Sequence, residues 1–221
     1  MNSKGDFKQN VRIWQQLYAD GRGDLQYPSD VFVRLCHRLL DPKTSRRVLD
    51  YGFGTGANLL HLARLGFSMT GVEVSAHALA KTADRLAKQD LHADLRLIEA
   101  GTSLPFADET FDVVVSWQVL YYNDWTSLRC AVAELNRVLR QGGLFVCSTC
   151  APGDVSMTLS DDLGGGLYRS RAPGQEGCII VVLNEAQLGE IFAGQTVDVG
   201  EFYHRMSDRI SRHWVVTYRK Q

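Results

Sequence analysis

A glycine-rich turn between two apolar segments is the strongest chemical feature of this 221-residue sequence. It reads Asp50-Tyr51-Gly52-Phe53-Gly54-Thr55-Gly56-Ala57-Asn58. Glycine can adopt positive φ and lets a ligand approach the backbone itself. A helix that begins after such a turn directs amide N–H groups toward a negative group such as a carboxylate or phosphate. The segment therefore predicts a ligand-binding turn, but the turn alone does not identify the ligand.

The next apolar segment ends in an acid, Glu73. A carboxylate has two acceptor oxygens, enough to bind both hydroxyls of a ribose. The turn read as G-x-G-x-x-A also satisfies a permissive fingerprint for a nicotinamide dinucleotide, with Glu73 at about the expected distance. A third interpretation is a turn that only lets a strand and a helix pack closely. The residues of the turn leave these interpretations open.

The elements that must position these residues alternate between strand and helix. Strands are expected at residues 48–50, 68–73, 94–98, 111–116 and 144–149. Helical spacing follows the first of these strands, continues from Ser75 to about Lys88 after the second, and returns from Asp124 to Leu139. Such alternation implies right-handed βαβ units. The sequence therefore predicts a doubly wound α/β fold with a mostly parallel sheet.

The two ends of the chain add a cover and a different kind of strand pairing. Amphipathic helices are expected at 11–18 and 31–40, and strand-like runs at 179–182, 197–202 and 213–218 with one helix at 184–192. With three strands and one helix, part of the sheet there should be antiparallel. We expect one domain, 1–221, made of an N-terminal helical cover (1–44), a binding core (45–150), a lid-like insertion (151–177) and the C-terminal part of the sheet (178–221).

Four stretches together resemble a known family. They read VLDYGFGTGAN, GVEVS, SLPFADETFDVVVSWQVLYY and ELNRVLRQGGLF, between Val48 and Thr149. This pattern is similar to that of the class I methyltransferases that use S-adenosylmethionine (SAM). The resemblance implies a Rossmann-like methyltransferase fold with a seven-stranded sheet and an antiparallel C-terminal strand. It also implies SAM as cofactor and S-adenosylhomocysteine as product.

The resemblance also implies which residues bind SAM. The turn would hold the methionine part, Glu73 the ribose, and the segment from Ala100 to Thr102 would lie along the adenine. The family usually has an aspartate where this chain has Ala100, so we expect adenine to be held by backbone groups, Glu99 or Thr102. The full expected set is Asp50, Gly52, Phe53, Gly54, Gly56, Asn58, Glu73, Val74, Ala100, Gly101, Thr102, Ser116 and Trp117.

The acceptor side is expected to begin after the fourth strand, with Gln118, Tyr121 and Tyr122. The family often has histidine at the position of Tyr122. A tyrosine with a pKa near 10 is a poor base at neutral pH. We therefore hypothesise that Tyr122, our one catalytic candidate, positions the acceptor by hydrogen bonding. Core packing is the alternative role for Trp117 and both tyrosines.

A lid is expected because methyl transfer benefits from a site without water. The N-terminal residues Trp14, Tyr18 and Tyr27 are one candidate, and the insertion at 151–177, with its three consecutive glycines 164–166, is the other. His204 follows a late strand and could face the acceptor, although a surface histidine is the alternative.

The sequence thus predicts an enzyme, a SAM-dependent methyltransferase acting by in-line displacement on an O or N atom of a small molecule or saccharide. The segment WQQLYADGRGDLQYPSD resembles the leader of a subgroup with such substrates. One alternative is an NAD(P)-dependent oxidoreductase, which would need a substrate domain or a Tyr-x-x-x-Lys pair. The other is a non-catalytic SAM-binding regulatory protein.

Composition limits the partners. A formal net charge of -1 offers no broad positive field for nucleic acid. Residues 1–10 are polar without the apolar core of a signal peptide, and no later run of about 18 apolar residues appears, so we expect no membrane association and a cytoplasmic location. The five cysteines suggest no disulfide framework, and the six histidines lack metal-ligand spacing, so no metal is expected. The oligomeric state is not predicted.

Overall fold

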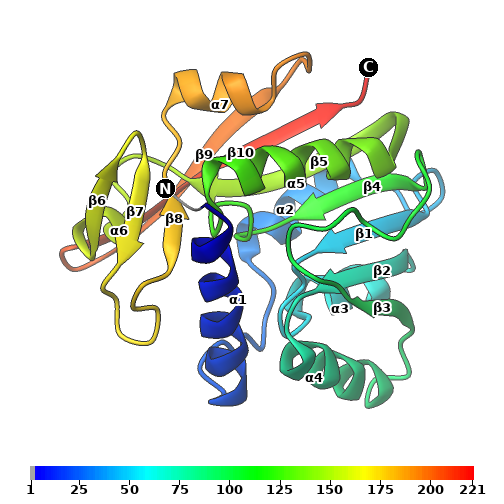
Figure 1. Ribbon diagram of the computed structural model, residues 1–221. Helices are drawn as coiled ribbons and strands as arrows, with labels where there is room; N and C mark the ends of the chain where they lie inside the picture. Colours follow the sequence, from blue (N-terminus) through cyan, green and yellow to red (C-terminus); the bar gives the residue numbers. More distant parts are fainter. Residues whose placement is uncertain (1–2) are drawn as a thin grey trace.

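The fold is built on one seven-stranded sheet, shown in Figure 1, a computed structural model that describes residues 3–221. The strand order is β3-β2-β1-β4-β5-β10-β9. The strands are β1 (Arg47–Tyr51), β2 (Ser68–Glu73), β3 (Ala93–Leu97), β4 (Phe111–Ser116), β5 (Leu139–Cys150), β9 (Asp198–Met206) and β10 (Arg209–Arg219). β10 is antiparallel to both its neighbours, β5 and β9, and the other pairs are parallel. The predicted doubly wound, mostly parallel sheet with an antiparallel C-terminal strand is confirmed.

The strand order reverses between β1 and β4, which pair in parallel through Val48–Val113, Leu49–Val114 and Asp50–Val115. The central strands are apolar on both faces because helices cover both sides, as expected for parallel sheets. Crevices at the carboxyl ends of the strands around such a reversal bind ligands in open α/β sheets. The glycine turn after β1 and the acid at the end of β2 lie at this edge.

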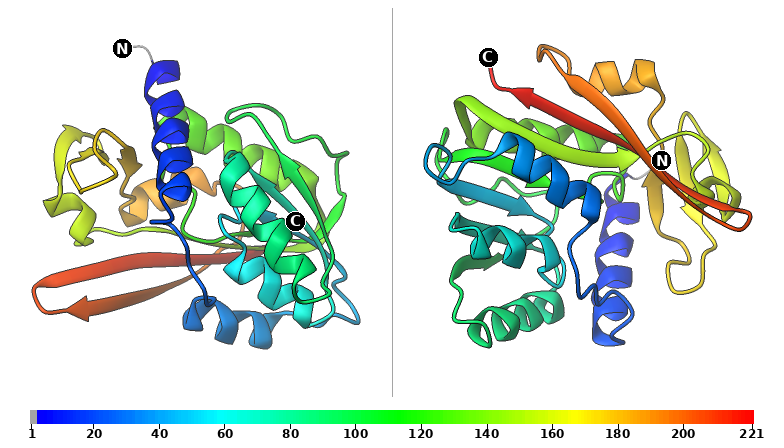
Figure 2. Two further views of the ribbon diagram at one scale, coloured as in Figure 1. Left: turned by 90° about the horizontal axis from the view of Figure 1, so that it is seen from below. Right: turned by 180° about the vertical axis from the view of Figure 1, so that it is seen from behind.

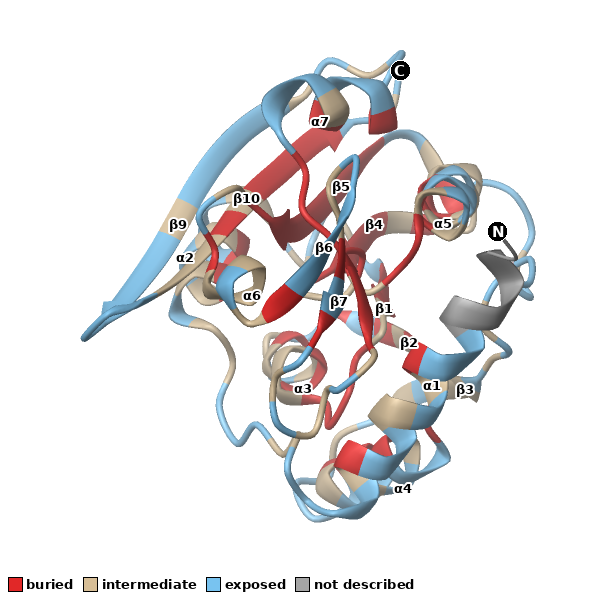
Figure 3. Ribbon diagram, turned by 60° about the vertical axis from the view of Figure 1, so that its left-hand side comes forward, coloured by how far each residue is buried: buried red, intermediate tan, exposed pale blue. Residues whose placement is uncertain are grey.

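Helices form a layer on each face of the sheet. Phe32, Leu59 and Leu86 belong to one core cluster and Leu128 and Leu188 to the other. The first cluster brings in α2 (Asp30–Leu39), α3 (Ala57–Arg64) and α4 (Ala76–Ala87), and the second brings in α5 (Trp125–Val138) and α7 (Glu185–Ile191). Figure 3 shows the buried central strands between these layers.

The predicted insertion at 151–177 contributes two strands to a second, three-stranded sheet. This sheet consists of β6 (Ser160–Gly164), β7 (Leu167–Ser170) and β8 (Ile179–Val181), preceded by α6 (Val155–Thr158). One prediction was wrong: the strand expected at 179–182 in the C-terminal part of the main sheet is β8, which pairs with β7 in the small sheet. The three glycines turn the chain between β6 and β7, and the Gly165 carbonyl accepts hydrogen bonds from Trp125 and Gln187.

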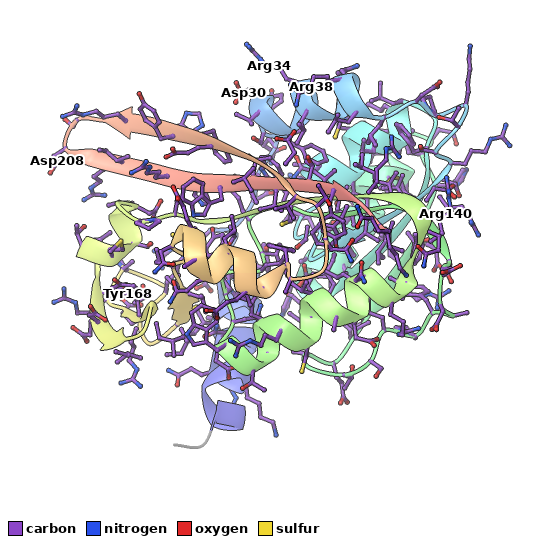
Figure 4. All side chains as sticks on the ribbon, turned by 90° about the horizontal axis from the view of Figure 1, so that it is seen from above. Asp30, Arg34, Arg38, Arg140, Tyr168 and Asp208 are labelled. Carbon is purple, nitrogen blue, oxygen red and sulfur yellow. The ribbon has the colours of Figure 1, made fainter. Side chains whose placement is uncertain are left out.

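Two further segments extend the core. The helix α1 (Ser3–Ala19) lies between the small sheet and α4, which Figure 1 shows from the front. β9 and β10 form a long hairpin that projects beyond the main sheet (Figure 2), with Asp208 at its tip (Figure 4). Both strands are longer than predicted because they pair with each other past the end of β5. Within residues 3–221, no helix combines the length and apolarity needed to cross a bilayer.

Candidate functional site

The glycine turn has the backbone that the sequence predicts. Gly52, Gly54 and Gly56 all have positive φ, at 74°, 56° and 83°. All three also lack room for a side chain: a methyl group added to Gly52 would lie 2.6 Å from Val119, one added to Gly54 would lie 2.7 Å from the Tyr18 hydroxyl, and one added to Gly56 would lie 2.6 Å from Thr82. A side chain at any of these glycines would therefore strain the backbone and displace the side chain that faces it.

Glu73 is buried at the end of β2 and connects that strand to the turn. Its Oε2 accepts a hydrogen bond from the Gly54 amide at 2.9 Å, and its Oε1 accepts from Val74 at 2.8 Å and Ser75 at 3.0 Å. Burial raises the pKa of this carboxyl although the three amides act in the opposite direction. Oε2 accepts only one of these bonds and retains a further lone pair, so the carboxylate can still accept from a ribose hydroxyl.

The Asp50 side chain is buried beneath the same turn, and its Oδ2 has no hydrogen-bond partner among the described residues. Burial, and then the negative charge of Glu73, raises the pKa of Asp50 to about 7. An unpaired buried carboxylate is costly, and a cation bound nearby would stabilise its charged form. Asp50 therefore fits the ammonium group of an amino acid moiety.

Two adjoining cavities open over these groups. The one beside Glu73 has a volume of about 100 Å³ and is also lined by Val74 and Ile98. The other, beside Asp50 and the glycine turn, has a volume of about 250 Å³. Both are lined by Gly52, Val119 and Tyr122, and by two side chains of α1. The site is thus one divided crevice. One part lies beside Glu73, and the other lies beside Asp50 and the glycine turn.

Those side chains of α1 are Trp14 and Tyr18, which stand where the two cavities meet. The ring of Trp14 lies 4.8 Å from that of Tyr122 and 5.6 Å from that of Tyr18, measured between centroids. Burial, together with the nearby charge of Glu73, raises the pKa of Tyr18 well above its usual value. The hydroxyl is therefore a neutral hydrogen-bond donor, and of the two lid candidates it is the N-terminal segment that lines the cavities.

Tyr121 and Tyr122 follow β4 as a pair of tilted rings in contact, their centroids 4.3 Å apart. Burial raises the pKa of both phenols. Neither ionises at neutral pH, which agrees with a positioning role for Tyr122 and argues against a base. Gln118, just before them, has a φ of 58°, an uncommon value for a residue with a side chain.

The expected adenine segment lies apart from the two cavities. Gly101 and Thr102 line a separate groove of about 290 Å³ together with Leu104 and Asn123, while Ala100 lines none of these spaces. Asn123 and Tyr51 also belong to the wall of the cavity beside Glu73, so the groove and that cavity share a side. Adenine contact by this segment stays a prediction.

The remaining predicted residues divide between wall and surroundings. Phe53, Asn58, Trp117 and Tyr27 line the cavity beside Asp50. Ser116 is fully buried in β4 and does not line either cavity. His204 is exposed on β9 and also lies outside both walls. The structure therefore offers no support for His204 facing the acceptor.

Asn10 was missed by the sequence analysis because no motif marks it, and the structure places it in the wall beside Glu73. Its buried amide donates to the carbonyls of Tyr122 and Ile179, both at 2.9 Å, and accepts from the Ile179 amide at 2.8 Å. Ile98 was missed as well, although it follows β3 and a strand-end rule would have found it.

Comparison with known proteins identifies the central segment. Residues 48–143 match the family described as a methyltransferase domain. Residues 48–143 form a methyltransferase domain of the class I, SAM-dependent kind. The predicted resemblance to this family is confirmed, and the methyltransferase match covers the glycine turn, Glu73 and the whole segment after β4.

Curated relatives match this methyltransferase core. A demethylmenaquinone methyltransferase of Corynebacterium kroppenstedtii is 32% identical over 116 residues, 51% of this chain and 46% of that protein. A malonyl-[acyl-carrier protein] O-methyltransferase of Pectobacterium atrosepticum is 32% identical over 119 residues, 53% of this chain and 44% of that protein. The chain thus spans about half the length of the curated relatives it matches.

Solved methyltransferase structures extend the likeness to the whole fold. The 1,6-didemethyltoxoflavin-N1-methyltransferase of Burkholderia thailandensis, bound to its substrate and S-adenosylhomocysteine, has a TM-score of 0.71 at 18% identity and covers 100% of this chain and 91% of its own. A SAM-dependent methyltransferase of Methanosarcina mazei has a TM-score of 0.71 at 20% identity, covering 84% and 96%. At these identities the comparison shows the fold alone.

Proposed function

We propose that the protein is an enzyme that transfers the methyl group of SAM to an oxygen or nitrogen atom of a small molecule, a class in which we include saccharides. The observation that carries the proposal is the arrangement of Asp50, the glycine turn and Glu73 around one divided crevice. An unpartnered buried carboxylate suits the ammonium group of the donor. The second carboxylate, Glu73 in the other part of the crevice, suits the ribose of the donor.

SAM would supply an electrophilic methyl on a sulfonium, and the residues of this chain would align it. Gly52 to Gly56 would hold the methionine part by backbone contact, with Val74 and Ile98 beside the adenosine. Trp14 and Tyr122 stand where the cavities meet, so their faces would offer the sulfonium a cation–π attraction of about 0.5–2 kcal/mol. Because charge is dispersed in the transfer, alignment and exclusion of water are the protein's main contribution.

The relatives support the reaction class and leave the acceptor open. Their names specify demethylmenaquinone, malonyl-[acyl-carrier protein] and 1,6-didemethyltoxoflavin as substrates of those proteins. These substrates differ from one another, so we do not assign any of them to this protein. The cytoplasmic location and the lack of nucleic-acid or membrane partners, expected from the sequence, stay predictions.

A thermal-shift panel with SAM, S-adenosylhomocysteine, NAD and NADP tests the proposal, because a ligand that binds the native state raises its apparent stability. We expect the first two to raise the melting temperature. A response to NAD or NADP alone would favour the oxidoreductase alternative. SAM binding without methyl transfer to any acceptor would favour the regulatory alternative.

A further inference from the structure

The wall of the cavity beside Asp50 is dominated by aromatic rings from separate parts of the chain. Rings come from α1, the loop after it and the segment after β4: Trp14, Tyr18, Tyr27, Trp117, Tyr121 and Tyr122. Flat apolar surfaces of this kind stack against flat ligands, and aromatic pairs gain about 0.5–1.5 kcal/mol beyond the area they bury. The wall therefore favours a planar ring as the group beside the transferring methyl.

The same wall carries little charge. Among the described residues that line it, none is lysine, arginine or histidine, and Asp50 is the one carboxylate. Asp50 lies under the glycine turn, at the end assigned to the donor. A carboxylate or phosphate away from the sulfonium would lose its hydration here without gaining a cationic side chain, which is costly. Carboxylated and phosphorylated acceptors are therefore disfavoured.

The mouth of this cavity is apolar and fixed in place. Leu25 and Tyr27 line it and are 64% and 83% exposed. Their loop is held by α4, because the Arg85 guanidinium donates to the Leu25 carbonyl at 2.8 Å and pairs with Asp24, which also pairs with Lys81. Two large apolar side chains held in water at the entrance are best explained by contact with an apolar ligand.

Asp50 is assigned to the ammonium group of the donor, so the acceptor must lose its proton without a base from this wall. The other titratable side chains of the wall are tyrosines, and burial raises the pKa values of Tyr18, Tyr121 and Tyr122. A phenol or an acidic ring N–H is a far stronger acid than the hydroxyl of a sugar, so it loses its proton to water far more readily, and the positive charge of the neighbouring sulfonium favours the anion. The neutral tyrosines can then donate hydrogen bonds to the anionic oxygen or nitrogen that forms.

We propose that the acceptor is a neutral, planar aromatic molecule that is methylated on a phenolic oxygen or an acidic ring nitrogen, which rests on the proposed methyltransferase function. The acceptor first releases its proton to water. Its oxygen or nitrogen then forms a bond to the methyl carbon while the bond from sulfur to that carbon breaks, and the sulfonium becomes a neutral thioether. This narrows the acceptor class and sets saccharides aside.

Three acceptor probes on related skeletons test the class. 2-Naphthol is flat, neutral and phenolic; 6-hydroxy-2-naphthoate adds a carboxylate to the same rings; and decahydro-2-naphthol keeps the skeleton without aromaticity. Methyl glucoside represents saccharides. Binding to the protein loaded with S-adenosylhomocysteine is measured by quenching of tryptophan fluorescence, and transfer by labelled methyl from SAM. We expect 2-naphthol to bind at least about tenfold more tightly than the others, a difference of about 1.4 kcal/mol.

Each outcome separates the acceptor class from the enzyme's function. Stabilisation by SAM together with preference for methyl glucoside, decahydronaphthol or the carboxylate overturns the acceptor class and leaves the function intact. Stabilisation by SAM with no saturable 2-naphthol binding also overturns the class. Failure of SAM and S-adenosylhomocysteine to stabilise the protein overturns the proposed function itself.

Variants at the mouth give a second test that leaves the core intact. Leu25→Ser and Tyr27→Ser should raise the KM for 2-naphthol about five- to tenfold, the loss expected from removing a contacting apolar side chain. Tyr203→Ser is the matched control, because Tyr203 is 65% exposed on β9 and lines neither cavity. Equal KM values for the three variants would contradict the role assigned to the mouth.

Discussion

Asn10 holds α1 in place over the site, and its replacement should loosen the wall that both cavities share. The side chain is 2% exposed and makes three hydrogen bonds to backbone groups of Tyr122 and Ile179. At about 1 kcal/mol for each bond, Asn10→Ala should cost about 3 kcal/mol. For a chain of this size, that corresponds to a fall in melting temperature of roughly 6–12 °C.

The functional effect follows from the position of Trp14 and Tyr18, which lie one and two helical turns beyond Asn10 on α1. When α1 loosens, these rings leave the junction of the cavities more often, and the bound donor is less enclosed. We therefore expect weaker stabilisation by SAM and slower turnover in Asn10→Ala. Asn10→Asp has nearly the same volume but cannot donate to the two carbonyls, so it separates lost hydrogen bonds from a packing defect.

Calorimetry and amide hydrogen exchange check this reasoning. Arg12→Ala is the control, because Arg12 is an exposed residue of the same helix. Asn10→Ala should speed exchange in α1 and β8 specifically, whereas the control should not. If Asn10→Ala and Asn10→Asp melt within about 1 °C of Arg12→Ala, with unchanged exchange in α1, then Asn10 does not hold the helix and the argument fails.

Three other predictions concern the crevice itself. Glu73→Gln should weaken SAM binding about tenfold or more, since a charged acceptor pair is lost; unchanged affinity by titration calorimetry would contradict the ribose assignment. Tyr122→Phe should lower turnover while the stabilisation by SAM is kept, and equal turnover would remove the positioning role. For Asp50, the folded pKa near 7 is above the unfolded value of 3.8, so the native state holds its proton longer, and this group's contribution to the free energy of unfolding falls as pH rises from about 4 to 7. Asp50→Asn should flatten that pH dependence in denaturant titrations, and SAM affinity in the parent protein should increase toward pH 7 as the carboxylate forms.

The core of the site could be predicted because its signals are local. Positive φ at Gly52 and Gly54 and the acid at the end of β2 follow from residue type and from the place of each residue at a strand end. Parallel strands bring their carboxyl ends to one edge whatever the rest of the chain does. The confirmed fold and family depend on these residues.

The surroundings of the site could not be predicted because their signals are ambiguous. Ile179 to Val181 form an apolar run that fits either sheet, and only its pairing with β7 decides between them. Asn10 is a polar residue in a polar helix, so nothing in the sequence distinguishes it from an exposed side chain. Tertiary contacts between distant segments determine both outcomes.

The small sheet acts on the site through α1. None of its residues lines either cavity among the described residues, yet β8 provides the Ile179 backbone that Asn10 binds, and its neighbour β7 packs Tyr168 into one cluster with Tyr121. The sequence suggested the insertion at 151–177 as a lid. The contacts instead favour a support: the insertion fixes α1 and Tyr121, and α1 covers the crevice. Deletion of β6 and β7 should therefore affect stability and turnover together, because the wall and its support are one packed unit.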